Sequence, residues 1–256
     1  MFKNKKIIVA NWKMNPITFR EAKKIFLDIK NTANKLLNIH IIICPPFLYL
    51  NELSALYKRH RMSVGAQNIF YKDSGFFTGM VSASMLRGNN IKYVILGHSE
   101  ARSLGEDDDV INQKVQISLK KGLRVILCVG EKERDEDGNH FNFLKDQILN
   151  SLKGVSLKSL ENIFVAYEPV WAISGKNGSS PMSSNDLYEM AIFIKKILSD
   201  NYKIKNLGVN ILYGGSVNPR NAKKLMEDGG VNGLLVGKAS LNSKKFNEIL
   251  KIANNF

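Results

Sequence analysis

The sequence predicts an α/β protein, a closed (β/α)8 barrel of eight parallel strands with helices on the outside. Eight short apolar runs recur along the 256-residue chain, and amphipathic stretches follow most of them. The runs are apolar at nearly every position, which is typical of strands buried on both faces of a parallel sheet. Barrels of about 250 residues ordinarily fold as one unit, so we expect one domain over residues 1–256.

The expected strands share this apolar, β-branched character. They are Lys6–Asn11, His40–Cys44, Met62–Gln67, Tyr93–His98, Arg124–Val129, Ile163–Glu168, Val209–Tyr213 and Gly233–Val236. The expected helices have apolar residues three and four positions apart. They are Phe19–Leu37, Phe47–Tyr57, Val110–Lys120, Asn142–Leu152, Ser184–Asn201, Asn218–Glu227 and Ser243–Ile252. The stretch between the third and fourth strands is less regular, and the charged cluster Glu131–Asp137 predicts a solvated loop or helix start.

An open doubly wound sheet is the competing architecture. That fold usually carries a glycine-rich phosphate loop directly after its first strand. Here the first strand runs into NWKMN at residues 11–15, which contains no glycine. The absence favours the barrel.

The net charge of +14 raises the question of a nucleic-acid partner. The lysines are scattered, and no run of five or more basic residues with interleaved aromatics occurs. We therefore expect no nucleic-acid partner, although a positive field would speed the capture of an anionic phosphate ester.

The two cysteines and the N-terminus indicate the compartment. Cys44 and Cys128 lie in apolar runs without disulfide or metal spacing, so we expect buried strand residues. The apolar stretch Ile7–Ala10 is too short for a signal peptide, and no later run approaches a membrane span. We expect a cytoplasmic enzyme with no membrane partner.

Polar residues that follow the strands are the candidates for chemistry, because barrel active sites form where strands end. They are Asn11, Lys13, Gln67, Asn68, His98, Glu100, Glu168, Ser216 and Gly237. A carboxylate, an imidazole and a fixed cation suffice for proton transfer. Neither metal-ligand spacing nor a nucleophilic serine motif occurs, so we expect no metal. We interpret His40, His60 and His140 as structural or solvent-exposed.

Two further segments fit a phosphorylated substrate. The glycine-containing turns YGGSV at 213–217 and VGKAS at 236–240 predict a phosphate cradle, which barrels commonly build after strands seven and eight. Residues 169–178, PVWAISGKNG, combine a rigid start with a flexible tip, as a hinged lid does. A lid that excludes water would protect an enediolate from losing its phosphate.

Short motifs along the whole chain resemble the triosephosphate isomerase family. They are NWKMN at 11–15, GAQN at 65–68, FTG at 77–79, GHSE at 97–100, CVGE at 128–131, AYEPVWAI at 166–173, YGGSV at 213–217 and LVG at 235–237. The resemblance implies a TIM barrel that interconverts dihydroxyacetone phosphate and D-glyceraldehyde 3-phosphate through an enediolate, in glycolysis and gluconeogenesis, without a cofactor.

The resemblance also implies roles for individual residues. Glu168 would be the base, neutral His98 would relay protons between the substrate oxygens, and Asn11 and Lys13 would stabilise the enediolate. Glu100 would hold Lys13 in place, with direct proton transfer as the alternative role. Backbone N–H groups would bind the phosphate, from Ser174, Ser216, Gly237 and Lys238. The lid would comprise Pro169, Val170, Trp171, Ala172, Ile173, Ser174, Gly175 and Lys176.

The family is typically dimeric, and the expected interface loop contains Phe76, Phe77, Thr78 and Gly79. Exposed neighbouring phenylalanines on a monomer would be a liability, so we expect a homodimer. The chain departs from the family pattern near this loop, with Ala101 in place of an arginine and Met80 in place of an acid. It also departs in the lid tip, SGKNG at 174–178, and at Lys238, which replaces a glycine.

Two rival interpretations predict different properties. Another barrel enzyme acting on a phosphorylated sugar, such as an epimerase, would require a metal or a paired acid and base. A basic binding protein on an inactive barrel would show no turnover despite an intact fold. Neither rival accounts for Lys13, His98 and Glu168 at strand ends.

Overall fold

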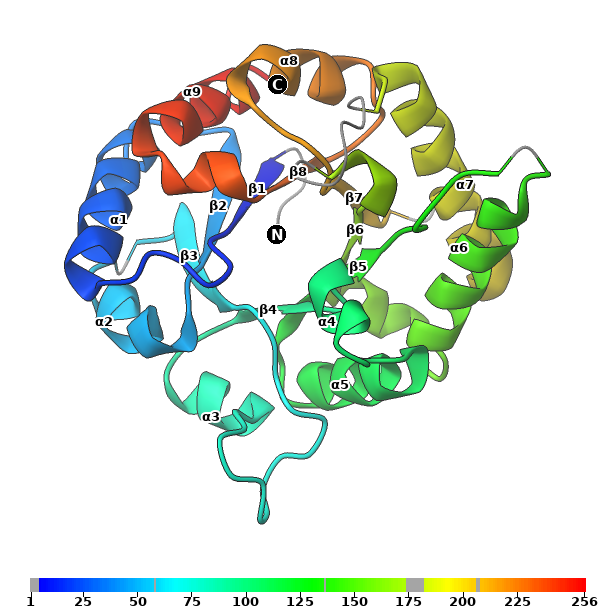
Figure 1. Ribbon diagram of the computed structural model, residues 1–256, viewed down its shortest axis with the longest axis horizontal. Coiled ribbons are helices and arrows are strands. Elements are labelled where there is room, and N and C mark those ends of the chain that lie inside the picture. The colour runs from blue at the N-terminus through cyan, green and yellow to red at the C-terminus, as the bar shows by residue number, and fades with distance from the viewer. Residues whose placement is uncertain (1–4, 58, 136, 174–181, 206–207) are drawn as a thin grey trace.

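Eight parallel strands close into a barrel in the order β1 to β8, with helices around the outside (Figure 1). The structure is a computed structural model that describes residues 5–57, 59–135, 137–173, 182–205 and 208–256. The closed order confirms the predicted barrel and excludes the open doubly wound sheet. Within these residues, no helix is long and apolar enough to cross a membrane.

The strands begin and end within two residues of the predicted bounds. They are β1 Lys6–Asn11, β2 Ile39–Cys44, β3 Met62–Ala66, β4 Tyr93–Leu96, β5 Arg124–Val129, β6 Ile163–Tyr167, β7 Asn210–Tyr213 and β8 Gly233–Val236. All neighbours pair in parallel, and β8 pairs with β1 from Ile7↔Gly233 onward. All eight carboxyl ends therefore meet at one end of the barrel, where the predicted site residues lie.

The α-helices that surround the strands are α1 Phe19–Ala33, α2 Leu50–Ala55, α3 Ala83–Gly88, α4 Ser99–Ser103, α5 Asp108–Lys120, α6 Asn139–Ser151, α7 Ser184–Tyr202, α8 Pro219–Glu227 and α9 Ser243–Ala253. Short 3-10 helices are η1 Phe47–Tyr49, η2 Leu157–Asn162, η3 Val170–Ala172 and η4 Lys238–Leu241.

The sequence missed two helices and extended the helix predicted as Phe19–Leu37 four residues beyond the end of α1 at Ala33. The helices α3 and α4 have six and five residues, too few for an apolar period to appear. Their starts are fixed locally instead, because the side chain of Ser82 accepts a hydrogen bond from Met85 N in α3. The predicted helix Phe47–Tyr57 divides into η1 and α2. His140, which we expected in a loop, lies in the first turn of α6.

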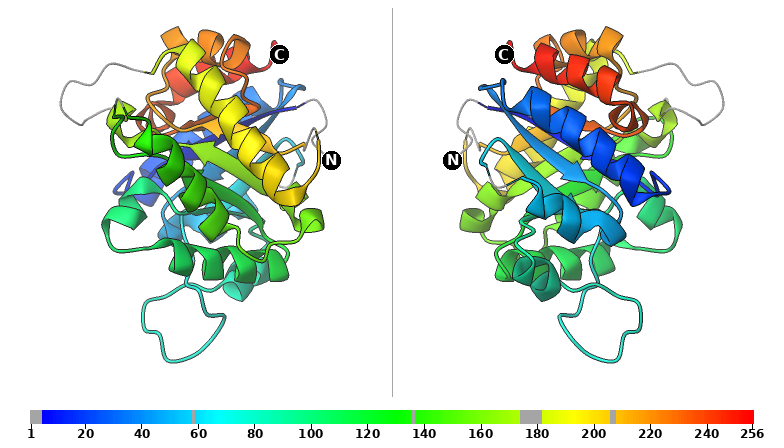
Figure 2. Two further views of the ribbon diagram at one scale, coloured as in Figure 1. Left: turned by 90° about the vertical axis from the view of Figure 1, so that its right-hand side faces the viewer. Right: turned by 90° about the vertical axis from the view of Figure 1, so that its left-hand side faces the viewer.

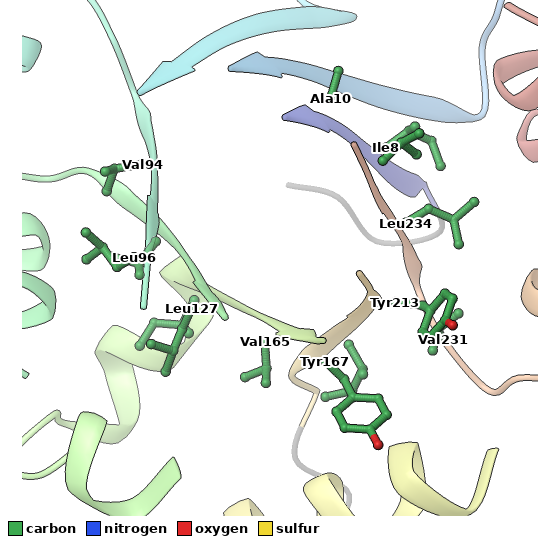
Figure 3. Close-up of a cluster of buried hydrophobic side chains, with 14 of the residues drawn as sticks. Ile8, Ala10, Val94, Leu96, Leu127, Val165, Tyr167, Tyr213, Val231 and Leu234 are labelled. Atoms are coloured by element: carbon green, nitrogen blue, oxygen red, sulfur yellow. The ribbon is translucent and has the colours of Figure 1, made fainter. Parts of the chain in front are cut away.

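The core has two layers because alternate strand residues point to opposite faces. Side chains such as Ile8, Val165 and Leu234 point outward to the helices (Figure 3). Their strand neighbours fill the barrel interior, where Cys44 and Cys128 are fully buried. Burial raises the pKa of both thiols, and Glu168 raises that of Cys128 further. The cysteines are thus buried strand residues, as predicted.

The amino end of the barrel interior contains a polar cluster around His40. His40 Nε2 lies 3.2 Å from Ser63 Oγ and 3.2 Å from the Tyr93 hydroxyl. Arg124 Nη1 donates a hydrogen bond of 3.1 Å to the same hydroxyl. Burial, and secondarily the charge of Arg124, lower the pKa of His40 from 6.5 to about 4. His40 is therefore a neutral structural side chain, as predicted.

Candidate active site

A hollow of about 390 Å³ opens at the carboxyl end of the barrel. Its lining comes from the ends of β1, β4, β6, β7 and β8, segments that are far apart in sequence. The predicted site residues that line it are Asn11, Lys13, His98, Glu168, Ile173, Ser216, Gly237 and Lys238. Barrel closure brings together the cation, the imidazole and the carboxylate that the sequence singled out.

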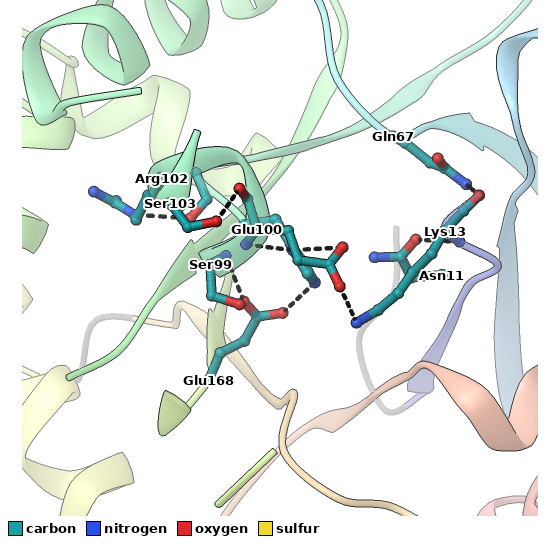
Figure 4. Close-up of polar contacts among 10 residues, drawn as sticks. Asn11, Lys13, Gln67, Ser99, Glu100, Arg102, Ser103 and Glu168 are labelled. Atoms are coloured by element: carbon teal, nitrogen blue, oxygen red, sulfur yellow. Dashed lines mark hydrogen bonds and ion pairs between the residues drawn. The ribbon is translucent and has the colours of Figure 1, made fainter. Parts of the chain in front are cut away.

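Lys13 has a constrained backbone and a fixed ammonium group. Its φ of 53° is in the left-handed region, which costs a non-glycine residue roughly 1 kcal/mol. Two hydrogen bonds hold this conformation, from Lys13 N to Asn11 Oδ1 (3.0 Å) and from Gln67 Nε2 to Lys13 O (2.8 Å). Lys13 Nζ lies 2.7 Å from Glu100 Oε1 (Figure 4). Asn11, Gln67 and Glu100 together orient the cation.

His98 lies at the N-cap of α4, and this position fixes its tautomer. Its Nδ1 accepts a hydrogen bond of 3.1 Å from Glu100 N. A ring nitrogen that accepts cannot carry a proton, so the neutral ring has its proton on Nε2. Nε2 lies 3.4 Å from Glu168 Oε1 and faces the hollow. The imidazole therefore presents a donor on the same side as the carboxylate.

Glu168 directly follows β6 and is 2% exposed. Ser99 N, in the first turn of α4, donates a 3.3 Å hydrogen bond to Glu168 Oε2 (Figure 4). Two glycines pack closely against this residue. A Cβ on Gly130 would lie 1.9 Å from Glu168 O, and one on Gly214 would lie 2.6 Å from Glu168 Cγ. Any side chain at Gly130 or Gly214 would therefore collide with Glu168 and displace it.

Arg102 supports the turn that carries His98. Its Nε donates to Gly97 O (2.8 Å), and its Nη1 lies 2.6 Å from Asp108 Oδ1. Gly97 has a φ of 70°, and a Cβ there would contact Cys128 O at 3.0 Å. Arg102, the last residue of the segment HSEAR at 98–102, thus fixes the start of α4.

Glu131 corrects the prediction that Glu131–Asp137 is solvated throughout, because this carboxylate is only 1% exposed. Its Oε1 accepts hydrogen bonds from the Tyr167 hydroxyl (2.7 Å) and from Trp171 Nε1 (2.9 Å). Arg134 also approaches it, with Nε 3.4 Å away, and its guanidinium lies 5.0 Å from the Trp171 ring centroid. Burial, and then the charge of Glu131, raise the pKa of Tyr167. Glu131 therefore anchors the start of the predicted lid.

The described part of the lid is ordered around this anchor. Pro169 precedes η3, Ala172 is buried, and Ile173 reaches the hollow. Val170 and Trp171 line a second cavity of about 570 Å³ behind Glu168. The remaining predicted lid residues, Ser174, Gly175 and Lys176, lie outside the described residues, and so does the Ser174 phosphate contact.

Asn68, which also follows a strand, does not join the site. Its Nδ2 donates to Glu106 Oε1 (2.8 Å), and Lys114 Nζ donates to its Oδ1 (3.0 Å). This partly buried network ties the segment after β3 to α5. Among the described residues, no group of three His, Cys, Asp or Glu side chains could hold a metal ion.

The predicted interface loop projects from the body of the molecule (Figure 2). Phe76 is fully exposed, and Thr78, Gly79 and Met80 are exposed beside it. Phe77 differs from the expected exposed pair, because its ring packs 4.7 Å from that of Phe70 within the same loop. The apolar surface that is available to a partner in this loop therefore comes from Phe76 and Met80.

A sequence model of the triosephosphate isomerase family matches residues 6–253. The chain belongs to the triosephosphate isomerase family. The triosephosphate isomerase of Thermodesulfovibrio yellowstonii is 41% identical over 251 residues, which cover 96% of this chain and 99% of the relative. That of Aquifex aeolicus is 40% identical over 249 residues, covering 96% and 98%. That of Endomicrobium trichonymphae is 36% identical over 249 residues, with the same coverage.

Sequence reasoning missed part of this triosephosphate isomerase site. Tyr167 and Arg134 were not singled out, and Glu131 appeared only in the CVGE motif and at the start of the charged cluster Glu131–Asp137, without a role in the site. A polar residue two positions after β5, near a strand end like the other site residues, was the available signal. The bonds from Tyr167 and Trp171 to Glu131 join β5 to β6 and the lid, a contact that no sequence spacing reveals.

Proposed function

We propose that the protein interconverts dihydroxyacetone phosphate and D-glyceraldehyde 3-phosphate in the cytoplasm, as an isomerase of glycolysis and gluconeogenesis. The observation that carries the proposal is the pair formed by His98 Nε2 and Glu168 Oε1, 3.4 Å apart in a hollow that Lys13 also lines. A triose phosphate is the substrate expected for this family, and a hollow of about 390 Å³ suits a molecule of that size.

Glu168 acts as the base that removes a carbon-bound proton and returns it to the neighbouring carbon. His98 donates a hydrogen bond from Nε2 to the substrate carbonyl oxygen and relays a proton between the two oxygens. A neutral imidazole at a helix N-terminus is the established assignment for this enzyme family. The hydrogen bond from Glu100 N to His98 Nδ1 supports the same protonation here.

Lys13 and Asn11 stabilise the negative charge that develops on the enediolate, because a fixed cation and a fixed amide require no reorganisation during the reaction. Glu100 is a positioning residue that holds Lys13 Nζ at 2.7 Å. No organic cofactor or metal is needed for these steps, since every proton moves between the substrate and side chains.

The substrate phosphate lies against the turns after β7 and β8. Ser216, Gly237 and Lys238 line the hollow with Glu168, their backbone N–H groups would be the donors, and Lys238 adds a positive charge. We propose that the lid that begins at Pro169 closes over the substrate; its predicted tip, with the Ser174 N–H donor, lies outside the described residues. Water is thereby excluded while the enediolate exists.

A coupled assay tests the proposed reaction. Isomerisation of D-glyceraldehyde 3-phosphate in the presence of a chelator is compared for the parent protein and Glu168→Asp. We expect full parent activity in chelator and a fall in kcat of at least tenfold for the shortened carboxylate, because the base no longer reaches the carbon. An inert parent protein would support the inactive binding-protein alternative. Loss of activity in chelator would support a metal-dependent epimerase.

We also propose that residues 1–256 form one domain and that two copies associate through the loop around Thr78. Closure of the barrel uses strands from Lys6 to Val236, and α9 packs against α1, which supports one folding unit. Five large apolar side chains among the described residues are at least 81% exposed, namely Met14, Ile17, Leu48, Phe76 and Leu104. Met14 and Ile17 follow Lys13, so a partner that covers them would also stiffen the catalytic lysine.

Sedimentation at increasing dilution, with turnover measured in the same samples, tests the dimer. We expect Phe76→Asp to shift the equilibrium to monomers and to lower turnover. Full activity in a verified monomer would refute the link between association and catalysis.

A further inference from the structure

A separate hollow, of about 600 Å³, opens at the amino end of the barrel. It lies between α2 and α3, beside the starts of β3 and β4, and shares no lining residue with the catalytic hollow. Nothing in the proposed isomerase mechanism uses it. Because it is larger than the catalytic hollow, it could hold a molecule larger than a triose phosphate.

The hollow exists because the barrel covering is thin here. The helices α2 and α3 are neighbours in the outer ring (Figure 1) and have six residues each. Six residues rise only about 9 Å along a helix axis, which is too short to cover a strand and the turn before it. The flank of β3 near Met62, Ser63 and Val64 is therefore reached from outside.

The rim of the hollow is cationic. Arg59 and Lys92 are exposed and line it from two different loops. No acidic residue is among its lining, and neither cation forms an ion pair with any residue that the structure describes. Two cations that converge on a concave surface without a carboxylate attract an anion.

The wall behind the rim adds hydrogen-bonding groups. The Tyr57 hydroxyl is buried and has no hydrogen-bond partner among the described residues. A buried hydroxyl without a partner costs free energy unless a ligand or water satisfies it. Asn51, Asn89 and Asn90 line the same space, and an amide can both donate to and accept from a hydroxyl group, although Asn89 Nδ2 already donates to Met85 O (2.9 Å).

The inner wall carries no compensating negative charge. Ser63 lines the hollow and contacts the buried His40, which faces the Tyr93 hydroxyl. The guanidinium of Arg124 lies on the far side of that hydroxyl. Arg59 and Lys92 are thus the positive groups that line the hollow, and Arg124 lies beyond Ser63, His40 and Tyr93.

We propose that this hollow binds a phosphorylated sugar of pentose or hexose size, with its phosphate between Arg59 and Lys92 and its hydroxyls on Tyr57 and the asparagine amides. Cations alone would suit any anion, whereas amides and a phenolic hydroxyl are the groups that recognise sugar hydroxyls. The site is separate from the isomerase centre, so the proposal does not depend on the proposed reaction.

Calorimetric titration with ribose 5-phosphate tests the site in the full-length protein. We expect one-to-one binding that is weakened at least tenfold in Arg59→Ser/Lys92→Ser. The matched control Lys120→Ser/Lys153→Ser removes the same charge from exposed positions outside the hollow and should change the affinity less than twofold. If both double variants weakened the binding of ribose 5-phosphate equally, the loss would be explained by net charge alone, and the proposal would be overturned.

Two further titrations show which part of the ligand, the phosphate or the sugar, the hollow recognises. Inorganic phosphate and ribose should each bind at least tenfold more weakly than ribose 5-phosphate, and Tyr57→Phe should weaken ribose 5-phosphate severalfold with an unchanged melting temperature. Phosphate binding as tight as ribose 5-phosphate would overturn recognition of the sugar. Binding that is unchanged in Arg59→Ser/Lys92→Ser would place the ligand in another site, such as the catalytic hollow, and would also overturn the proposal.

Discussion

The two ends of this barrel each contain a buried histidine, and the two have different surroundings. His98, at the carboxyl end, is 8% exposed and faces the carboxylates of Glu168 and Glu100. His40, at the amino end, is 4% exposed and faces two hydroxyl groups with Arg124 behind them. Burial alone therefore does not distinguish a catalytic imidazole from a structural one.

The neighbours of each ring decide its role. At the carboxyl end, Glu168 can accept a proton and His98 presents one, so protons can move through the hollow. At the amino end, burial and then the charge of Arg124 hold His40 neutral, and its Nε2 contacts the hydroxyl groups of Ser63 and Tyr93. This agrees with the general division of barrels, in which the carboxyl ends carry function and the amino ends carry stability.

The sharpest way to break this comparison is to make the same substitution at both ends. His98→Gln should lower kcat by about 10³-fold, because it removes a general acid and relay. His40→Gln should leave kcat within twofold, since the amino end does not contact the substrate. Steady-state kinetics of the two variants measure this. Similar losses in both would show that the two ends are coupled.

The pH dependence of the free energy of unfolding tests whether His40 is neutral in the folded protein. The folded state lowers the pKa of His40 from 6.5 to about 4, so the unfolded chain binds a proton more readily between these values. Unfolding therefore takes up a proton, and the free energy of unfolding falls as the pH drops from 6.5 to about 4, then levels off for this group. A shift of this size corresponds to about 3 kcal/mol.

Urea unfolding at several pH values, with His40→Gln as the comparison, isolates this contribution from the other titrating groups. We expect a shallower slope for the variant between pH 6.5 and 4. Parallel slopes for the two proteins would mean that His40 is protonated equally in the folded and unfolded states.

A glycine substitution tests how tightly the carboxyl end is fitted. Gly214→Ala places a Cβ 2.6 Å from Glu168 Cγ, so the carboxylate must move. A displacement of about 1 Å in a base can cost up to 10²-fold, and we expect a fall in kcat of roughly 30-fold. Gly88→Ala is the control, because no atom lies within 4 Å of its added Cβ. Unchanged kcat in Gly214→Ala would show that the position of Glu168 tolerates displacement.

The sequence predicted the barrel and the central site because both follow from local pattern. Apolar runs defined the strands to within two residues, and strand ends placed Lys13, His98 and Glu168 at one end of the barrel. The helices α3 and α4 were missed because five or six residues are too few to show a period. Glu131 was taken for a solvated charge because its partners, Tyr167 and Trp171, come from another strand and its lid. The roles of the site residues remain predictions, and Ser174 lies outside the described residues.

Exchange of substrate hydrogen with solvent tests the central claim most directly. Dihydroxyacetone phosphate is incubated in D₂O with the parent protein or with Glu168→Gln, and deuterium in the recovered trioses is followed by NMR. If Glu168 carries the proton between the carbons, the parent protein should introduce deuterium during turnover and the variant should do so at least 10³-fold more slowly, in line with loss of a general base. Deuterium incorporation at the parent rate by Glu168→Gln would contradict the account.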